Sequence, residues 1–213
     1  MTIRRRVIGA LLAGLLLSAA AAGCGRDHDA DRNGTAHIDI SAAPATAKWQ
    51  SYRGVYVPTT QAGPAETGGP VPVKYQQNPQ GAVVAAMQAQ ARLSLAPDDA
   101  WNKVANTLVV AGPGRDAFAT ARVFASITTE TDPAQTAQFQ GFRIDGWTPE
   151  AVTVWLATRM PTGELSAQPS RMLWRSGDWK LELPAGQKAD EQGRVPTDPV
   201  ALTNLDGYTE FHR

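Results

Sequence analysis

The spacing of apolar residues changes once along this chain, and the change restricts the folds that it can adopt. Between residues 78 and 125 apolar side chains recur at helical spacing, whereas after Thr131-Asp132-Pro133 they alternate as in a β-strand. Helices grouped ahead of strands favour an antiparallel sheet, because a parallel sheet needs the two in alternation. The sequence therefore predicts an α+β domain in which N-terminal helices pack on a curved antiparallel sheet.

Three helices are expected. The first begins at the Asn-Pro pair 78–79, because asparagine caps a helix and proline has no N–H to leave unbonded in the first turn. The second begins near Pro97, where two following aspartates complement the helix dipole. The third covers about residues 115–125, and we expect its inward face to end at Phe124 or Ala125.

Four strands are expected after the helices, at residues 139–145, 151–160, 164–175 and 179–183. The second has apolar side chains on both faces, which is typical of a central strand covered on both sides. Ser176-Gly177-Asp178 predicts a tight turn, and the clean alternation after it indicates a β-hairpin.

The apolar pattern separates five of the six tryptophans into a group expected in the core and a group that could be exposed. Trp101, Trp155 and Trp179 fall at positions expected to face the core. Trp147 and Trp174 fall where they could be exposed and could line a groove or an interface, a setting in which tryptophan is enriched. Packing in the core is the competing interpretation for both.

The first 24 residues have the three parts of a secretory signal. Three arginines precede an apolar run from Val7 to Ala22, and small residues follow. The run Ala21-Ala22-Gly23-Cys24 resembles a bacterial lipobox, in which cleavage after Gly23 exposes a cysteine that is diacylated, although alanine stands where leucine is preferred. We expect residues 1–23 to be a lipoprotein signal peptide and Cys24 to carry the lipid.

Two alternatives to lipidation remain open. The apolar run could stay attached as a signal anchor, but its sixteen residues are fewer than the ~20 that span a bilayer. Cleavage could also be of the ordinary kind, with Cys24 as a bystander. Lipid alone would hold the chain, because each buried methylene contributes about 0.8 kcal/mol and two or three acyl chains give stable attachment. The expected location is the outer face of the cell membrane.

The segments around the core differ in composition. Residues 24–47 are small and polar and predict a flexible tether. Asp27-His28-Asp29 within it could bind a metal ion, but closely spaced ligands on a flexible tether bind weakly. Residues 48–77 carry aromatic residues among prolines and glycines, and predict an extended arm across the domain or a recognition strip for a partner. The core is expected over 78–184, with 185–213 as a tail packed on it.

The charge of the chain argues against nucleic acid as a partner. The formal net charge is zero, but without residues 1–23 there are 17 basic and 20 acidic side chains, a net charge of about −3. A mildly acidic domain lacks the clustered basic surface that binds phosphates. The single cysteine also leaves no internal disulfide, so the core must be held by packing.

Candidate chemistry is sparse. His28, His37 and His212 all lie in the flanks, where they are poorly placed to serve as the fixed base of a Ser–His–Asp site. Gly112-Pro113-Gly114 precedes the third helix but lacks the lysine and hydroxyl residue of a phosphate loop. No metal site and no cofactor are expected.

One route to catalysis remains, a buried carboxylate with a raised pKa that acts as a general base. The candidates are Asp145, Glu164 and Asp178, with Arg143 and Arg159 as charged neighbours, and Asp145, Arg159 and Glu164 are expected to share a pocket between helices and sheet. Asp145 and Asp178 come at turns, where aspartate is favoured for local hydrogen bonds, so a structural role competes. We expect no catalytic residue.

Three motifs stand out together: the helix start Asn78-Pro79-Gln80-Gly81-Ala82, the hairpin from Leu173 to Leu181, and the closing run from Leu205 to Phe211. Over residues 49–211 they resemble an uncharacterised actinobacterial lipoprotein family with a nuclear-transport-factor-two-like (cystatin-like) domain. Members of that family often sit beside conjugative elements, so the resemblance implies an envelope component accessory to conjugation or type IV secretion. Asn78 replaces the usual threonine, which exchanges one good cap for another.

We therefore expect a membrane-anchored envelope lipoprotein whose domain binds another envelope protein or serves as a structural module, without catalysis. The rival interpretation is a small-molecule-binding or isomerase-like enzyme that uses a pocket between helices and sheet. An open pocket with a buried, unpaired carboxylate would favour the enzyme, and a packed interior would favour the module.

Overall fold

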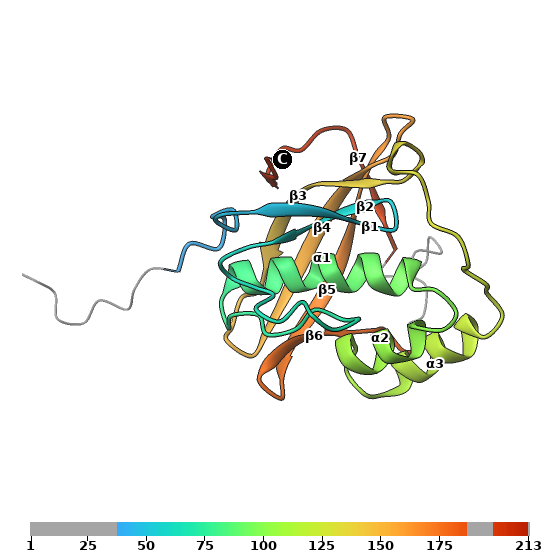
Figure 1. Ribbon diagram of the computed structural model, residues 1–213. Helices are drawn as coiled ribbons and strands as arrows, with labels where there is room; N and C mark the ends of the chain where they lie inside the picture. Colours follow the sequence, from blue (N-terminus) through green and yellow to red (C-terminus); the bar gives the residue numbers. More distant parts are fainter. Residues whose placement is uncertain (1–37, 187–197, 213) are drawn as a thin grey trace, which may run out of the picture. The chain divides into compact units, whose positions relative to one another are not determined.

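The structure, a computed structural model, describes residues 38–186 and 198–212 of the chain (Figure 1). Within these residues three α-helices come before a mostly antiparallel sheet, so the predicted α+β class is confirmed. The helices are α1 (Pro79–Leu95), α2 (Trp101–Leu108) and α3 (Pro113–Arg122). The longer strands of the sheet are β3 (Gln138–Asp145), β4 (Ala151–Arg159), β5 (Leu165–Arg175) and β6 (Asp178–Glu182).

The sheet has the strand order β6-β5-β4-β3-β8, and β7 pairs with β5 outside this path. All of these pairs are antiparallel. β4 has the predicted central place, but the expected cover on both faces is incomplete, because Thr153 and Trp155 on its second face are only half-buried. The strands β7 (Val200–Leu202) and β8 (Thr209–Glu210) were not predicted, because two or three residues are too few to show alternation.

Two short-range predictions are confirmed. The side chain of Asn78 accepts the N–H of Gly81 at 2.7 Å and caps α1. At the end of β5, a two-residue loop of Ser176 and Gly177 joins the strands, with φ angles of 54° and 76°. Positive φ at both loop residues gives the turn whose twist matches that of antiparallel strands.

The first half of the expected arm forms a β-hairpin. Its strands are β1 (Lys48–Tyr52) and β2 (Val55–Thr59), and the two valines of β2 are buried in the core with α1. The buried amide of Gln88 in α1 donates to the carbonyl of Pro58 at 3.1 Å. The hairpin is therefore joined to α1 by both apolar packing and a buried hydrogen bond.

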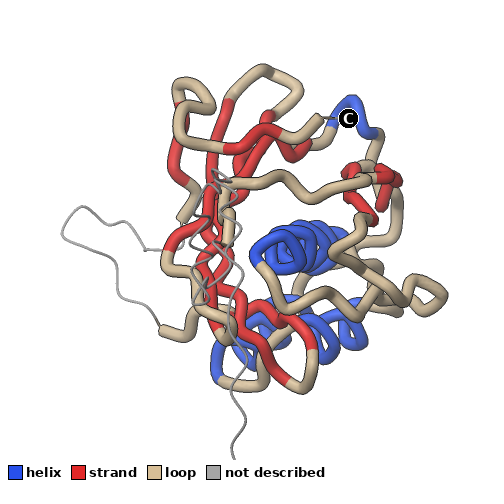
Figure 2. Tube along the Cα trace, turned by 90° about the vertical axis from the view of Figure 1, so that its left-hand side faces the viewer, coloured by secondary structure: helices blue, strands red, loops and turns tan. Residues whose placement is uncertain are grey.

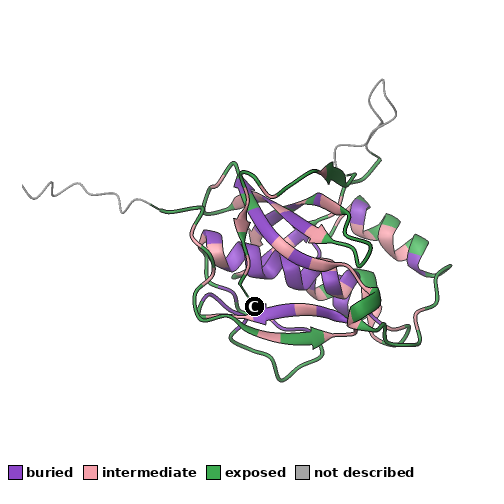
Figure 3. Cartoon of the chain, turned by 90° about the horizontal axis from the view of Figure 1, so that it is seen from above, coloured by how far each residue is buried: buried purple, intermediate pink, exposed green. Residues whose placement is uncertain are grey.

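Helix α1 lies between the sheet and the β1–β2 hairpin (Figure 2). Twelve of its 17 residues are buried, along nearly its whole length (Figure 3). The face predicted to be apolar is buried, and so are the alanines on the other sides. The burial is wider than a single stripe because the helix is covered from two directions, and small alanine side chains let both layers approach closely.

Helix α2 begins later than predicted, at Trp101 rather than near Pro97. Residues 98–100 form a turn instead. The Asp98 carboxylate does not cap α2, because it accepts hydrogen bonds from the segment that follows α3. The expected helix start is therefore used as a contact between two parts of the chain.

Helix α3 ends at Arg122, three residues earlier than predicted. The chain turns away there, and Phe124 and Ala125, one of which was expected to end the inward face, are both exposed. That prediction is wrong. At the helix end the buried guanidinium of Arg122 donates to the carbonyls of Ala96 and of Ala125, and these bonds hold the turn that replaces a further helical repeat.

The three tryptophans expected in the core differ in how far they are buried. Trp179 is buried, and its indole N–H donates to the carbonyl of Gln76 at 2.9 Å. Trp101 is half-buried where α2 meets α3. The prediction for Trp155 is wrong, because alternation along β4 turns it to the face away from α1. There the guanidinium of Arg143 lies 5.4 Å from the centre of its ring.

Candidate functional site

Gly23 and Cys24, the expected cleavage and lipidation residues, lie outside the described part of the chain. The described chain begins at Ile38, and the next few residues are held by the domain. Gln80 at the start of α1 donates to the carbonyls of Asp39 at 3.0 Å and Ala42 at 3.1 Å. The Thr209 hydroxyl of β8 donates to the same segment, to the carbonyl at residue 41, at 2.7 Å. These bonds fix the place where the chain joins the domain.

The three residues expected to share a pocket are not brought together. Asp145 ends β3 and pairs with Arg143 at 3.3 Å, with both side chains exposed. Arg159 and Glu164 lie in the β4–β5 hairpin, where each is exposed and makes a local hydrogen bond. In register Asp145 lies opposite Thr153, six positions along β4 from Arg159 and so roughly 20 Å from it.

Trp147 and Trp174, the expected interface residues, both pack on Trp179. The ring centroids are 5.7 Å apart for Trp147 and 5.3 Å apart for Trp174. Each of the two outer rings is half-buried. Trp147 also lines a cavity of about 420 Å³ together with Ile38, so this cluster continues to the place where the chain joins the domain. Both tryptophans therefore combine core contact with partial exposure.

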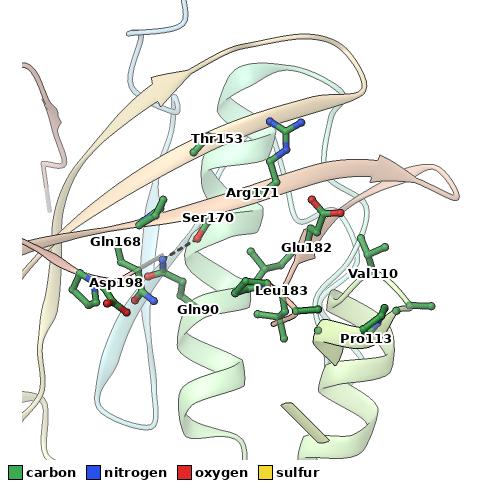
Figure 4. A pocket seen from close by; sticks show the side chains of 18 residues that line it. Gln90, Val110, Pro113, Thr153, Gln168, Ser170, Arg171, Glu182, Leu183 and Asp198 are labelled. Atoms are coloured by element: carbon green, nitrogen blue, oxygen red, sulfur yellow. Dashed lines mark hydrogen bonds between the residues drawn. The ribbon is translucent and has the colours of Figure 1, made fainter. Parts of the chain in front are cut away.

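A cavity of about 830 Å³ lies at the edge of β5, between α1 and the start of α3 (Figure 4). On its inner side the amide of Gln90 donates to the hydroxyl of Ser170 at 2.8 Å. The ionisable residues that line it are Arg171, Glu182 and Asp198, and all three are exposed. Its apolar lining includes Val110, Pro113, Pro169, Leu181, Leu183 and Pro184.

Among the described residues, strand β5 has no strand neighbour over the part that borders this cavity. β6 pairs with β5 from Arg171 onward and β7 pairs with it up to Ala167, which leaves residues 168–170 between them. The register turns the backbone of Pro169 toward the gap, since the N–H of Trp174 donates to the β4 side and successive residues alternate. Proline has no N–H, so this edge carries no unpaired donor.

The turn after α3 presents two apolar side chains to solvent. Val123 is 70% exposed and Phe124 is 87% exposed. The two side chains are adjacent in the chain, and contiguous exposed apolar surface marks interaction sites in proteins. The sequence reasoning missed this pair because it read both residues as the end of a helical face, and no local signal marked the helix end at Arg122.

The backbone of that turn is held by a network of buried and charged groups. The buried guanidinium of Arg122 donates to the carbonyl of Ala96 at 3.0 Å and to the carboxylate of Asp98 at 2.8 Å. The same carboxylate accepts the hydroxyl of Ser126 at 2.7 Å and the N–H of Ile127 at 2.9 Å. Residues before α2 and after α3 are thereby joined on both sides of Val123–Phe124.

These bonds favour the charged form of the Asp98 carboxyl. They lower its pKa from 3.8 to about 2, with the N–H of Ile127 as the largest cause, followed by the hydroxyl of Ser126 and by Arg122. The group is exposed, so its charged form keeps most of its hydration in the folded protein. The carboxylate is therefore ionised, and accepts these bonds, at every pH above the acidic range.

Two further properties of the described residues bear on function. No group of three or more histidine, cysteine, aspartate or glutamate side chains in this part of the chain is arranged to hold a metal ion. Among the helices formed by these residues, none has both the length and the apolar character to cross a bilayer.

Comparison with known proteins identifies a family. A family model described as a domain of unknown function (DUF8175) matches residues 13–210. The matched span therefore takes in Cys24 as well as nearly all of the described domain. No curated protein and no solved structure matches significantly.

Proposed function

The chain belongs to this family, DUF8175, and we propose that it is a lipid-anchored envelope protein whose domain binds another protein or serves as a structural module, without catalysis. The observation that carries the proposal is the ordered turn with exposed Val123 and Phe124. Burying apolar side chains of this size against a partner is favourable, and a fixed backbone reduces the entropy lost on binding.

The anchoring rests on Cys24 and its surroundings. An arginine cluster, a short apolar run and small residues precede the cysteine, and two or three acyl chains on one residue hold a protein stably. The family match begins inside the apolar run, at residue 13, which supports a shared pattern that includes Cys24. Thirteen residues, 25–37, separate Cys24 from Ile38, and this part of the expected 24–47 tether is roughly 45 Å long at full extension.

The finer fold is part of the same proposal. Three helices ahead of an antiparallel sheet, with α1 across one face, support a cystatin-like or nuclear-transport-factor-two-like cone. The motifs at Asn78, at the Ser176-Gly177 turn and near the end of the chain support an actinobacterial origin and a role accessory to conjugation or type IV secretion. An adjacent conjugation operon is the genomic observation that tests this context.

Metabolic labelling with a fatty-acid probe tests the anchor. The wild-type protein is expected to incorporate the probe and Cys24→Ser is expected not to, because the thiol is the acceptor. Gly25→Ser is the matched control, since it changes the neighbouring residue and leaves the thiol in place. Equal labelling of wild type and Cys24→Ser would rule out lipidation at this residue.

Photo-crosslinking in cells tests the binding role. A photoreactive phenylalanine analogue at position 124 is expected to form an adduct with one defined envelope protein, because that side chain lies in the interface. The same analogue at Thr120, which is exposed one turn earlier in α3, is the matched control. Equal yields at both positions, or no protein adduct at position 124, would contradict the proposal.

A small-molecule-binding or isomerase-like role for the 830 Å³ cavity is the second candidate. Its volume and its mixture of apolar side chains with the Gln90–Ser170 pair favour a ligand site. Its carboxylates, Glu182 and Asp198, are exposed, whereas a general base of this kind has its pKa raised by burial. Gln168→Trp, at an exposed lining position, would obstruct the cavity. Loss of biological function in this variant, with Phe124→Ser unaffected, would favour the enzyme.

A further inference from the structure

We propose that the end of the domain where the chain joins it rests on the lipid bilayer, so that Val123 and Phe124 at the opposite end face away from the membrane. This inference rests on the proposed lipid anchor. We call the residues concerned the joining end, and define it as Ile38, Ile40 and Trp147. The turn Val123–Phe124 is called the α3 turn.

The joining end and the α3 turn lie at opposite ends of the domain. In two perpendicular views the chain joins the domain near the start of α1, whereas α3 lies beyond the other end of that helix (Figures 1 and 3). The 17 residues of α1 span about 25 Å between them. A bilayer in contact with the joining end therefore leaves the α3 turn in water.

The joining end carries the side chains that a bilayer interface favours. Ile38 is 51% exposed and Ile40 is 37% exposed. Trp147 lines the same cavity as Ile38 and is half-buried, with one side of its ring packed on Trp179. Tryptophan is enriched at the boundary between membrane and water, because its ring is apolar and its N–H is polar.

Because the chain is already attached to the membrane, even a weak contact with lipid is enough to orient the domain. A random coil of thirteen residues has an average end-to-end distance of roughly 20 Å, so the length of residues 25–37 allows the joining end to lie close to the acylated cysteine. Binding of a tethered surface is intramolecular, and its effective concentration is high. Three apolar side chains that would not hold a free protein on a membrane can therefore orient one that is already attached.

Site-specific fluorescence on vesicles tests this orientation. The acylated full chain is reconstituted into vesicles of equal parts phosphatidylglycerol and phosphatidylethanolamine, with an environment-sensitive dye on Ile40→Cys, Phe124→Cys or Met160→Cys. Met160 is the matched control, because it is apolar and 42% exposed but lies in the β4–β5 hairpin. The dye at position 40 is expected to shift to the blue and to be quenched by spin-labelled lipid. The dyes at positions 124 and 160 are expected to stay in water.

Each other outcome overturns the inference in an identifiable way. A water-like dye at position 40 on acylated protein means that the domain stands clear of the bilayer. Quenching at position 124 instead means that the domain is oriented the other way round. Mass measurement on the same sample reports acylation, so a chain without acyl groups overturns the proposed anchor together with this inference.

Discussion

The carboxylate of Asp178 accepts the backbone N–H of Tyr75 at 3.0 Å, although 103 positions separate the two residues in the chain. It also accepts the N–H of Lys74 at 2.8 Å and that of Trp179 at 3.0 Å. One side chain at the β5–β6 turn thus satisfies three backbone donors and joins the segment ahead of α1 to the sheet. Burial, and secondarily this carboxylate, raises the pKa of the Tyr75 hydroxyl.

Asp178→Ala is expected to lower the free energy of unfolding by about 2–3 kcal/mol, because it removes charge-assisted hydrogen bonds from three backbone N–H groups, two of which are half-buried. Urea unfolding followed by tryptophan fluorescence measures the change. Asp145→Ala is the control, since it breaks an exposed ion pair and is expected to cost less than about 1 kcal/mol. Equal losses in the two variants would show that Asp178 has no special structural role.

Features that depend on short-range interactions could be predicted from the sequence, whereas features that depend on distant partners could not. Asn78 and the Ser176-Gly177 turn were predictable, because each acts on backbone groups within three residues. The face on which Trp155 lies, and the exposure of Phe124, depend on distant partners and were predicted wrongly.

The candidate sites show the same limit more strongly. The 830 Å³ cavity is lined by α1, the start of α3, β5 and the segments after β6 and before β7. These elements are far apart in the sequence, so no local pattern predicts that they form a cavity. The network around Asp98 joins residues 24 to 29 positions apart. The aspartates near Pro97 predicted only a helix start, because a carboxylate suited to the helix dipole is equally suited to a distant N–H.

Trp179→Ala is expected to cost about 3–5 kcal/mol, because the ring is buried and its removal leaves a large cavity beneath Trp147 and Trp174. Trp179→Phe should cost less, since it keeps an aromatic ring and loses the bond to Gln76. Thermal and urea unfolding of the three proteins measure the order. An unchanged melting temperature in Trp179→Ala would refute the place of this ring in the core.

The pKa of Asp98 predicts a pH dependence with a definite sign. Its pKa is about 2 in the folded protein and near 3.8 in the unfolded chain, so the unfolded state binds the proton more readily. The contribution of this group to stability is therefore present above about pH 4 and is lost as the pH falls toward 2. Asp98→Asn should show a shallower decline in melting temperature across this window than wild type, whereas Asp99→Asn should follow wild type.

Phe124→Ser separates a binding role from a structural one. The side chain is 87% exposed, so the substitution is expected to change the free energy of unfolding by no more than about 0.5 kcal/mol. Phe142→Ala, at a buried position of β3, should cost about 3–5 kcal/mol in the same urea titration. If Phe124→Ser instead destabilised the fold strongly, the ring would belong to the core. The turn would then not be a docking surface. A stable Phe124→Ser protein that no longer crosslinks from a photoreactive residue at neighbouring Val123 would place the loss in binding alone.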